Sequence, residues 1–236
     1  MILISCVDAF ADRVGNGNPA GVCMLHEPMD LSWMQLVARE MNLSETAFLQ
    51  TENDGFSLRW FTPTTEVDLC GHATLASAHV LWEREYLKPT EIARFFTKNG
   101  TLSAVKKNEW IEMDFPAEPE QAARAPVGLI ESLGVKPLYI GKNRFDYIIE
   151  VATEEEVQNL KPDFSALSTI PTRGVIVTSS SKGGDYDFVS RFFAPSVGVP
   201  EDPVTGSAHC CLYPFWEKRL QKTEFLAYQA SARGGF

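Results

Sequence analysis

Two stretches of the chain hold residue types that carry acid–base chemistry. The segment EVDLCGHATLASA, residues 66–78, places a cysteine, a glycine and a histidine together at the start of a predicted helix of small residues. The segment NLSETAF, residues 42–48, places one carboxylate, Glu45, among apolar neighbours. Apolar surroundings disfavour the charged form of a carboxyl group, which suits a general acid–base residue. Glu45 is therefore a candidate proton carrier; the alternative is a solvated glutamate at a strand edge.

A later stretch repeats the pattern around the first helix start. RWFTPTTEVDLCGHATLASAHVLW begins at Arg59, and RFFAPSVGVPEDPVTGSAHCCLYPFW begins at Arg191. Each contains Arg-aromatic-Phe-x-Pro, an acidic loop, and a helix of small residues that starts with glycine and includes a histidine. The second loop is three residues longer. This shared order predicts a duplicated fold whose equivalent helices begin at Gly71 and Gly206.

The two helix starts are candidate anion sites. The first backbone N–H groups of a helix have no intrahelical partner, and the aligned peptide dipoles add about half a positive charge there. If the two halves face each other, these N–H groups would hold a small carboxylate. The residues concerned are Gly71, His72, Ala73 and Thr74 in the first half and Gly206, Ser207 and Ala208 in the second. The alternative is that the glycines only allow close helix packing.

Other uses of these residues remain open on the sequence alone. Cys70-x-His72 suggests a metal, but the chain has no Cys-x-x-Cys or His-x-x-x-His spacing, and we predict no metal site. His72 is also compatible with a purely structural place at a helix start. Asp202, in the turn PEDPVTG, is also compatible with a helix-capping role.

Bulk properties exclude several functional classes. The chain has 236 residues, a formal net charge of −10 and five cysteines. The negative charge argues against nucleic-acid binding, and the absence of a long apolar run argues against a membrane span. An odd number of cysteines without framework spacing is typical of a reducing compartment. The first ten residues lack the features of a signal peptide. We therefore expect a soluble, cytoplasmic protein.

Hydrophobic periodicity and capping signals predict mixed elements. Strands are expected over residues 2–10 and 21–25, and a hairpin over residues 100–115 with its turn near residues 107–108. Helices are expected over residues 71–85 and 206–220, the latter kinked or broken early at Pro214.

Two further helix starts are predicted from capping boxes. Ser32 with Gln35 and Thr153 with Glu156 show the required spacing. The Pro-rich, acidic stretch MDFPAEPE marks a domain boundary, which divides the chain into residues 1–116 and 117–236.

Five ordered motifs resemble one protein family. DAFADRVGNGNPAGV, MNLSETAF, FTPTTEVDLCGHATLASA, FAPSVGVPEDPVTGSAH and YQASARGG are similar to segments of the phenazine-biosynthesis PhzF-like proteins. The resemblance covers nearly the whole chain. It implies an α+β architecture of the diaminopimelate epimerase-like fold. In that fold two pseudo-symmetric domains each wrap a mostly antiparallel sheet around a central helix, with the active site in the cleft between them.

The same resemblance implies a cofactor-free isomerase that acts on a small carboxylate. Glu45 matches the family residue that moves a proton between substrate carbons, and His72 and Asp202 match residues near the substrate. The resemblance places substrate-binding positions at Asn18, Gly71, Ala73, Thr74, Thr205, Gly206 and Ser207. Related racemases use two opposed cysteines; here Cys70 matches the first, whereas Thr205 stands at the second, which argues against a two-thiol mechanism.

The family usually continues beyond the point where this sequence stops. Because the sequence ends at Phe236, we expect the second domain to lack the last family strands, and the uncovered sheet edges to favour dimerisation. A homodimer is also the commonest assembly for such a protein. Two alternatives to the isomerase stand: a catalytically inactive member that binds a small molecule or a protein, and a one-thiol racemase built on Cys70.

Overall fold

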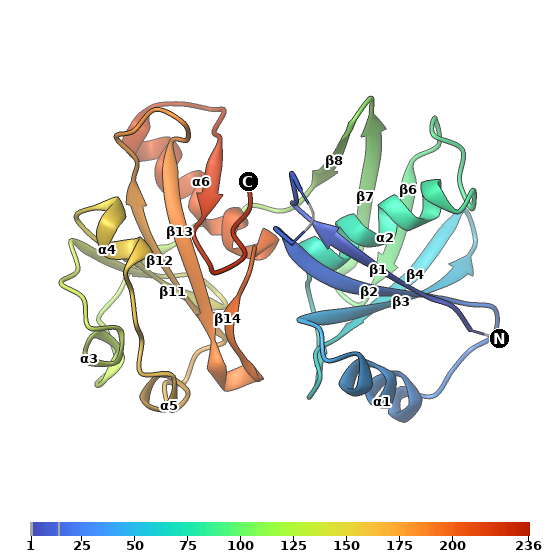
Figure 1. Cartoon of the computed structure of the whole chain (residues 1–236), viewed down its shortest axis with the longest axis horizontal. Helices are drawn as coiled ribbons and strands as arrows, with labels where there is room; N and C mark the ends of the chain where they lie inside the picture. Colours follow the sequence, from blue (N-terminus) through green and yellow to red (C-terminus); the bar gives the residue numbers. More distant parts are fainter. Residues whose placement is uncertain (1, 14) are drawn as a thin grey trace. The chain divides into compact units, whose positions relative to one another are not determined.

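The computed structural model describes residues 2–13 and 15–236, which form two β-sheets with helices packed on them (Figure 1). Contacts group these residues into two units. Unit 1 contains residues 2–9 and 18–116, and unit 2 contains residues 10–13, 15–17 and 117–236. The α+β class is confirmed. The predicted domains, residues 1–116 and 117–236, stay a prediction, and the contacts assign the loop before residue 18 to unit 2.

Unit 1 is a sheet with the strand order β1-β2-β3-β4-β6-β7-β8, with β5 beside β4. Its elements are β1 (Ile4–Ala9), β2 (Asn18–Leu25), α1 (Leu31–Met41), β3 (Glu45–Glu52), β4 (Gly55–Phe61), β5 (Glu66–Val67), α2 (Gly71–Glu83), β6 (Ala93–Thr97), β7 (Gly100–Lys107) and β8 (Trp110–Asp114). Strands β2 and β3 are parallel and connected through α1, whereas β3 and β4 are antiparallel. The predicted hairpin is confirmed, because β7 and β8 pair across a turn at residues 108–109.

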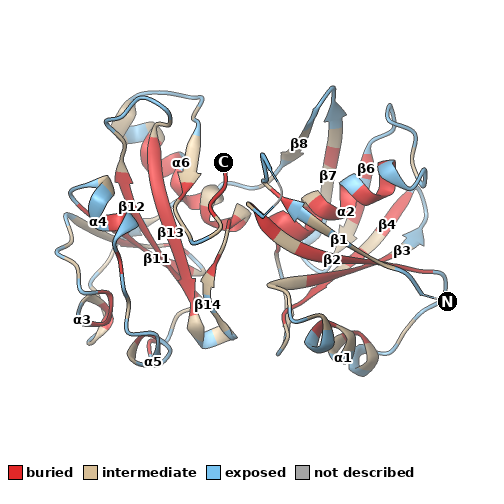
Figure 2. Cartoon of the chain, in the orientation of Figure 1, coloured by how far each residue is buried: buried red, intermediate tan, exposed pale blue. Residues whose placement is uncertain are grey.

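The two faces of this sheet bury different side chains. Along β2, Val22 and Met24 belong to the core cluster that contains α2, while Cys23 and Leu25 belong to the cluster that contains α1. This alternation follows from the two-residue period of a strand. Alanines and other small residues along α2 are buried, which lets the sheet approach the helix closely (Figure 2).

Unit 2 has the strand order β14-β13-β12-β11-β10-β9, with β15 beside β13. Its elements are β9 (Gln121–Ala122), α3 (Leu129–Leu133), β10 (Tyr139–Lys142), β11 (Asp146–Glu150), α4 (Glu154–Gln158), α5 (Phe164–Leu167), β12 (Gly174–Ser180), β13 (Phe188–Ala194), the 3₁₀ helix η1 (Pro195–Val197), β14 (Val199–Asp202), α6 (Gly206–Leu220) and β15 (Ala227–Gln229). Residues of this sheet form one core cluster with α6 and a second core cluster with the short helices α3, α4 and α5.

The two units share one internal topology. In each, an antiparallel pair precedes a parallel crossover (β1-β2-β3 and β10-β11-β12), and a further antiparallel strand leads through a short strand into the long helix. The helices α2 and α6 begin at Gly71 and Gly206, so the predicted equivalence is confirmed. The longer second loop begins with η1, whose first residue is the shared Pro195.

A repeated ion pair supports the duplication in atomic detail. In unit 1 the Arg59 guanidinium donates to both carboxylate oxygens of Glu66 at 2.8 and 2.9 Å. In unit 2 Arg191 holds Glu201 in the same two-bond manner at 2.7 and 2.9 Å. Each glutamate precedes the helix glycine by five residues. The ion pair therefore fixes the segment that leads into each helix.

One predicted capping box is wrong and the other is confirmed. Helix α1 begins at Leu31, so Ser32 lies inside its first turn and the N-cap is Asp30, which makes no side-chain capping bond. The Gln35 side chain instead donates to the Thr62 carbonyl at 2.9 Å, a tertiary contact that the local pattern does not reveal. In α4 the Glu156 amide donates to Thr153 Oγ1 at 3.2 Å, as predicted.

Helix α6 continues past Pro214, so the early break, one of the two predicted alternatives, does not occur, and the kink stays a prediction. A proline lacks the N–H that would bond the carbonyl four residues earlier. Here that carbonyl, on Cys210, accepts a hydrogen bond from the Glu118 amide at 2.8 Å. Because the carbonyl has a partner from outside the helix, the chain continues as helix to Leu220.

No helix in the described part of the chain is both long and apolar enough to cross a membrane.

Candidate active site

Local topology brings three predicted site residues of unit 1 together. The parallel strands β2 and β3 begin at the same end of the sheet, where Ala20 lies opposite Glu45. Asn18 is the first residue of β2, and Glu45 is the first residue of β3. Helix α2 packs against β2, so its second residue, His72, reaches the same end of the sheet.

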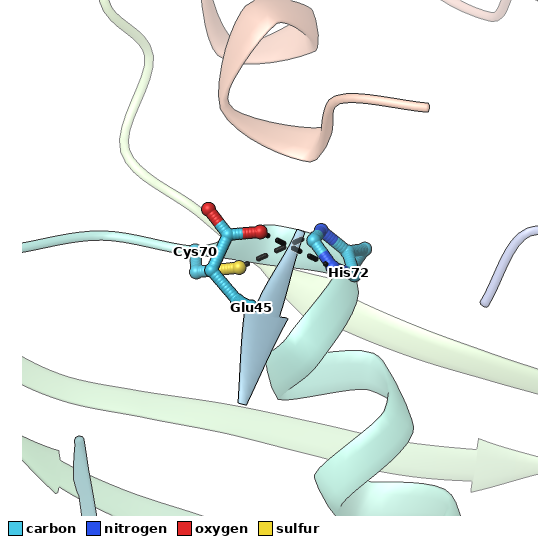
Figure 3. A group of neighbouring side chains, drawn as sticks. All are labelled: Glu45, Cys70 and His72. Atoms are coloured by element: carbon cyan, nitrogen blue, oxygen red, sulfur yellow. Dashed lines mark hydrogen bonds and ion pairs between the residues drawn. The ribbon is translucent and has the colours of Figure 1, made fainter. Parts of the chain in front are cut away.

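The three side chains form a chain of contacts around the imidazole of His72, and Figure 3 shows His72 and Glu45 of this chain together with Cys70. Asn18 Nδ2 lies 3.2 Å from His72 Nδ1, and His72 Nε2 lies 3.4 Å from Glu45 Oε2. Asn18 is fully buried, and the side chains of His72 and Glu45 are 3% and 15% exposed. The carboxylate therefore keeps partial access to solvent, while the groups behind it are buried.

These contacts define the hydrogen position on the imidazole. In the amide orientation that the structure gives, Asn18 Nδ2 can only donate, so His72 Nδ1 accepts and carries no hydrogen. Burial lowers the pKa of His72 to about 3, which keeps the ring neutral at ordinary pH. A neutral ring without a hydrogen on Nδ1 carries it on Nε2. The hydrogen is then on Nε2, the ring nitrogen that lies 3.4 Å from Glu45 Oε2.

Cys70 adds a thiol to the same cluster. Its Sγ lies 3.6 Å from His72 Nδ1, and the ligand atoms of Glu45, Cys70 and His72 all lie within 4.8 Å of one another. The sulfur lies beside Nδ1 of the ring and the carboxylate lies beside Nε2, so each group has its own ring nitrogen as a neighbour. The arrangement therefore favours a hydrogen-bonded acid–base group. The predicted absence of a metal stays a prediction.

One of the substrate-binding donors expected at the start of α2, the Thr74 hydroxyl, already makes a hydrogen bond within the protein. The Thr74 hydroxyl donates to the Cys70 carbonyl at 2.6 Å. Gly71 and Ala73 are buried in the first turn of the helix. Substrate binding by Thr74 stays a prediction and requires its hydroxyl to leave this bond.

The remaining predicted site residues lie in unit 2. Asp202 ends β14, and Thr205, Gly206 and Ser207 lead into α6. The Thr205 hydroxyl donates to Asp202 Oδ2 at 2.5 Å, and both residues are buried. The structure thus brings Asp202 and Thr205 together by a direct hydrogen bond.

Unit 2 has no counterpart of the Glu45 carboxylate. Thr46 pairs with Phe61 in unit 1 and Val175 pairs with Phe193 in unit 2, so the residue equivalent to Glu45 is Gly174. A side chain at Gly174 would collide with the Phe192 ring. The duplication therefore supplies a carboxylate at this strand start in unit 1 only.

Two polar residues that the sequence analysis did not single out contact the unit 2 positions. Arg173, paired with the buried Asp146, donates through Nη2 to Ser207 Oγ at 3.2 Å. Gln229 contacts both Asp202 and Thr205. The only sequence signal for Gln229 was its place in the motif YQASARGG; nothing in the local sequence marked Arg173.

Comparison with known proteins places these features in a family. The family model of the phenazine biosynthesis-like proteins (PhzC–PhzF) matches residues 7–236. A protein of Halalkalibacterium halodurans named as an uncharacterized isomerase is 60% identical over 233 residues, which cover 98% of this chain and 88% of the relative. A human phenazine biosynthesis-like domain-containing protein is 38% identical over 259 residues, covering 98% of this chain and 89% of the relative.

Solved structures agree with the sequence comparison. A PhzF-family protein of Enterococcus faecalis superposes with a TM-score of 0.90 at 45% identity, covering 99% of this chain and 88% of that protein. A probable proline racemase from Agrobacterium radiobacter shares the fold with a TM-score of 0.69 at 10% identity, covering 99% of this chain and 83% of that protein. Both the resemblance and the pseudo-symmetric, diaminopimelate epimerase-like fold are confirmed. The chain belongs to the phenazine biosynthesis-like family, a family of isomerases.

Proposed function

We propose that the protein is a cofactor-independent isomerase that moves a proton between carbons of a small carboxylate, with Glu45 as the general acid and base. The observation that carries the proposal is the Asn18–His72–Glu45 chain of contacts. It supplies a partly exposed carboxylate with a neutral N–H behind it. No cofactor and no metal takes part in the proposed mechanism.

The reaction begins when ionised Glu45 removes a proton from a carbon next to a carboxylate or enamine. The C–H bond breaks, its electron pair enters the conjugated system, and the proton moves to the Glu45 carboxylate. Protonated Glu45, which is partly exposed and exchanges its proton with solvent, then delivers a proton to another carbon of the same system, and the double bond shifts. Because one group removes and delivers the protons, both steps take place on one face of the substrate.

Positive ends of helix dipoles assist this chemistry. The first turn of α2, with Gly71 and Ala73, stabilises negative charge that develops on the substrate. Asn18 and Thr74 are proposed as further substrate contacts in unit 1. We also propose that Asp202 takes part in catalysis, and that Thr205, Gly206 and Ser207 bind substrate.

One specific contact favours a second candidate function. Cys70 Sγ approaches the His72 imidazole at 3.6 Å, a thiol–imidazole arrangement that can activate a thiol for proton transfer. A one-thiol racemase would lose activity on alkylation by iodoacetamide, and bound substrate would protect it. The equivalent position in unit 2 is Thr205, which supplies no second thiol.

Location and assembly are part of the proposal. The five cysteines all lie in the described part of the chain and form no disulfide there, as is usual in a reducing compartment, so we propose a cytoplasmic protein. We propose a homodimer, which light scattering of the purified protein would identify by its mass.

The proposal is tested by carbon-bound hydrogen exchange in D₂O. Purified protein is incubated with small cyclic and α-amino carboxylates, and deuterium uptake at carbon is followed by NMR. Wild type incorporates deuterium into at least one compound, and Glu45→Gln abolishes this uptake while ligand-induced thermal shifts persist. The matched control is Glu52→Gln, which changes an exposed glutamate at the other end of the same strand and leaves exchange unchanged.

Two results would contradict the proposed role. Binding of a compound without exchange by wild type would identify a binding protein in place of an enzyme. Exchange that survives in Glu45→Gln but stops after Cys70→Ala would assign the chemistry to the thiol.

A further inference from the structure

The side chain of Gln229 joins both ends of the turn that holds Asp202. Gln229 is the last residue of β15 and is 1% exposed. Its Oε1 accepts from the Thr205 amide at 2.8 Å, and its Nε2 donates to the Asp202 carbonyl at 2.7 Å. A third bond runs from Nε2 to Thr205 Oγ1 at 3.1 Å. One buried amide therefore fixes the turn at three points.

The backbone partners determine how this amide is oriented. A main-chain N–H can only donate, so the atom facing Thr205 N is the amide oxygen. A main-chain carbonyl can only accept, so the atom facing the Asp202 carbonyl is the amide nitrogen. These two contacts leave a single assignment for the ends of the amide.

The amide in turn directs the hydroxyl of Thr205. Because Gln229 Nε2 donates to Thr205 Oγ1, the hydroxyl hydrogen is free to point to Asp202 Oδ2, 2.5 Å away. Gln229 therefore donates to the Thr205 hydroxyl, and this hydroxyl in turn donates to the Asp202 carboxylate. Successive donors of this kind polarise and strengthen one another.

Strand pairing holds Gln229 itself in place. Its register partner is Ser190 in the parallel pair of β15 and β13. Its backbone N–H and carbonyl exchange hydrogen bonds with Gly235 at 3.0 and 3.3 Å. The amide thus stands on a paired segment and not on a free loop.

We infer that Gln229 is a positioning residue, which orients the Asp202 carboxylate through Thr205 by the three hydrogen bonds that its buried amide makes to the turn. The inference rests on the proposed role of Asp202 in the isomerisation. Gln229 acts through Thr205 and Asp202 and does not itself take part in proton transfer.

The most direct test is Gln229→Glu, which exchanges the donor nitrogen for an oxygen. In its ionised form the new carboxylate accepts from the Thr205 hydroxyl and draws its hydrogen away from Asp202. We expect kcat for carbon-bound exchange to fall at least about tenfold at pH 8, the loss typical of a hydrogen bond to a charged group, with KM changed less. Burial and the neighbouring Asp202 carboxylate raise the pKa of the introduced glutamate above its ordinary value of about 4.3, and as the pH falls through that raised pKa the protonated side chain donates again. The variant's deficit relative to wild type therefore shrinks at low pH.

Two further variants keep the test informative if Gln229→Glu does not fold. Thr205→Val removes the hydroxyl while leaving the Gln229 bonds to the backbone, and is expected to lose kcat to a similar extent. Thr205→Ser restores the hydroxyl and is expected to recover it. Ser190→Ala is the control, because it removes a buried hydroxyl at the register partner of Gln229 without changing the turn.

Failure of this inference is distinguishable from failure of the proposed function. If wild type and Asp202→Asn exchange equally, the proposed role of Asp202 fails. If Asp202→Asn is impaired but Gln229→Glu keeps the wild-type kcat across the pH range, the positioning role is overturned. A deficit of constant size at every pH indicates a structural role and also overturns it. Amide hydrogen exchange of Thr205, measured without substrate, should be faster in Gln229→Met, and an unchanged rate contradicts the hydrogen-bond assignment itself.

Discussion

At the residue scale, the candidate site depends on which nitrogen of one imidazole carries a hydrogen. Asn18 accounts for that choice in unit 1, because its amide donates to Nδ1 and leaves the N–H on the side of Glu45. Gln229 fills a comparable place in unit 2, where a second buried amide directs a hydroxyl towards Asp202. Both amides are uncharged. The amide of Asn18 orients the imidazole beside Glu45, and the amide of Gln229 orients the hydroxyl beside Asp202.

Replacing Asn18 by aspartate tests the first of these arrangements. The variant keeps the size of the side chain but offers an acceptor to Nδ1, which favours the imidazole with its hydrogen there. The Nε2 lone pair would then face the Glu45 carboxylate. We expect the exchange rate to fall at least about tenfold.

Nitrogen-15 NMR of the His72 ring reports the outcome directly. Wild type should show a protonated Nε2 and an unprotonated Nδ1, and Asn18→Asp should show the reverse. Asn53→Asp, a change of the same chemistry in an exposed turn, is the control and should alter neither the spectrum nor the rate. A variant ring that kept its hydrogen on Nε2 would disprove the orienting role of Asn18.

At the element scale, the two equivalent arginines fix the segments before α2 and α6, but their surroundings differ. Arg59 contacts Glu66 and is 32% exposed at its side chain. The Arg191 side chain is 10% exposed and also donates to carbonyls at the end of α4, including Leu160 O at 2.9 Å. A cation at a helix C-terminus is favourable, so Arg191 stabilises both an ion pair and a helix end.

This difference predicts unequal costs for the same substitution. Arg191→Met leaves a carboxylate and several carbonyls without their donor in a buried setting, and should lower the free energy of unfolding by about 3 kcal/mol. Arg59→Met removes a more exposed pair and should cost about 1 kcal/mol. Urea unfolding of the two variants measures both values, and each variant is the other's control. Equal costs would contradict the role of the carbonyl contacts.

At the scale of the whole molecule, each unit holds a histidine in the first turn of its long helix, His72 buried and His209 half-buried. Burial lowers the pKa of His72 to about 3 and also lowers the pKa of His209, whose Nδ1 lies 2.8 Å from the Thr205 carbonyl. In the unfolded chain both rings have an ordinary pKa of about 6.5. Below that pH the unfolded state therefore binds more protons than the folded state.

The sign of the pH dependence follows from this difference in proton binding. Stability rises with pH wherever the unfolded state binds more protons. The stabilisation from a neutral His72 is thus fully present above about pH 6.5 and is lost as the pH falls towards 3. The limiting slope is about 1.4 kcal/mol per pH unit for one ring.

Urea unfolding between pH 4 and pH 8 tests the prediction. His72→Gln should reduce the pH dependence by up to this slope, because a glutamine does not titrate. The comparison variant is His26→Gln, which replaces an exposed histidine and should leave the slope unchanged. The prediction fails if His72→Gln retains the full wild-type slope.

The sequence alone determined features that depend on local composition and order. The repeated Arg-aromatic-Phe-x-Pro pattern located both helix starts, because small residues after a glycine specify a helix that a sheet can approach closely. The spacing of Thr153 and Glu156 located a cap, since both partners lie within one turn. The resemblance of five motifs to one family predicted the α+β fold and the isomerase class.

Only the tertiary structure decided which hydrogen-bond donors and acceptors from distant segments pair with one another. Glu118 bonds the carbonyl that Pro214 leaves open, and this donor lies 92 residues before its acceptor on Cys210 (210 − 118). The Gln229 amide likewise meets a turn that precedes it by more than twenty residues. Local patterns record periodicity and caps, whereas a hydrogen bond between distant segments exists only once the sheet register brings donor and acceptor together.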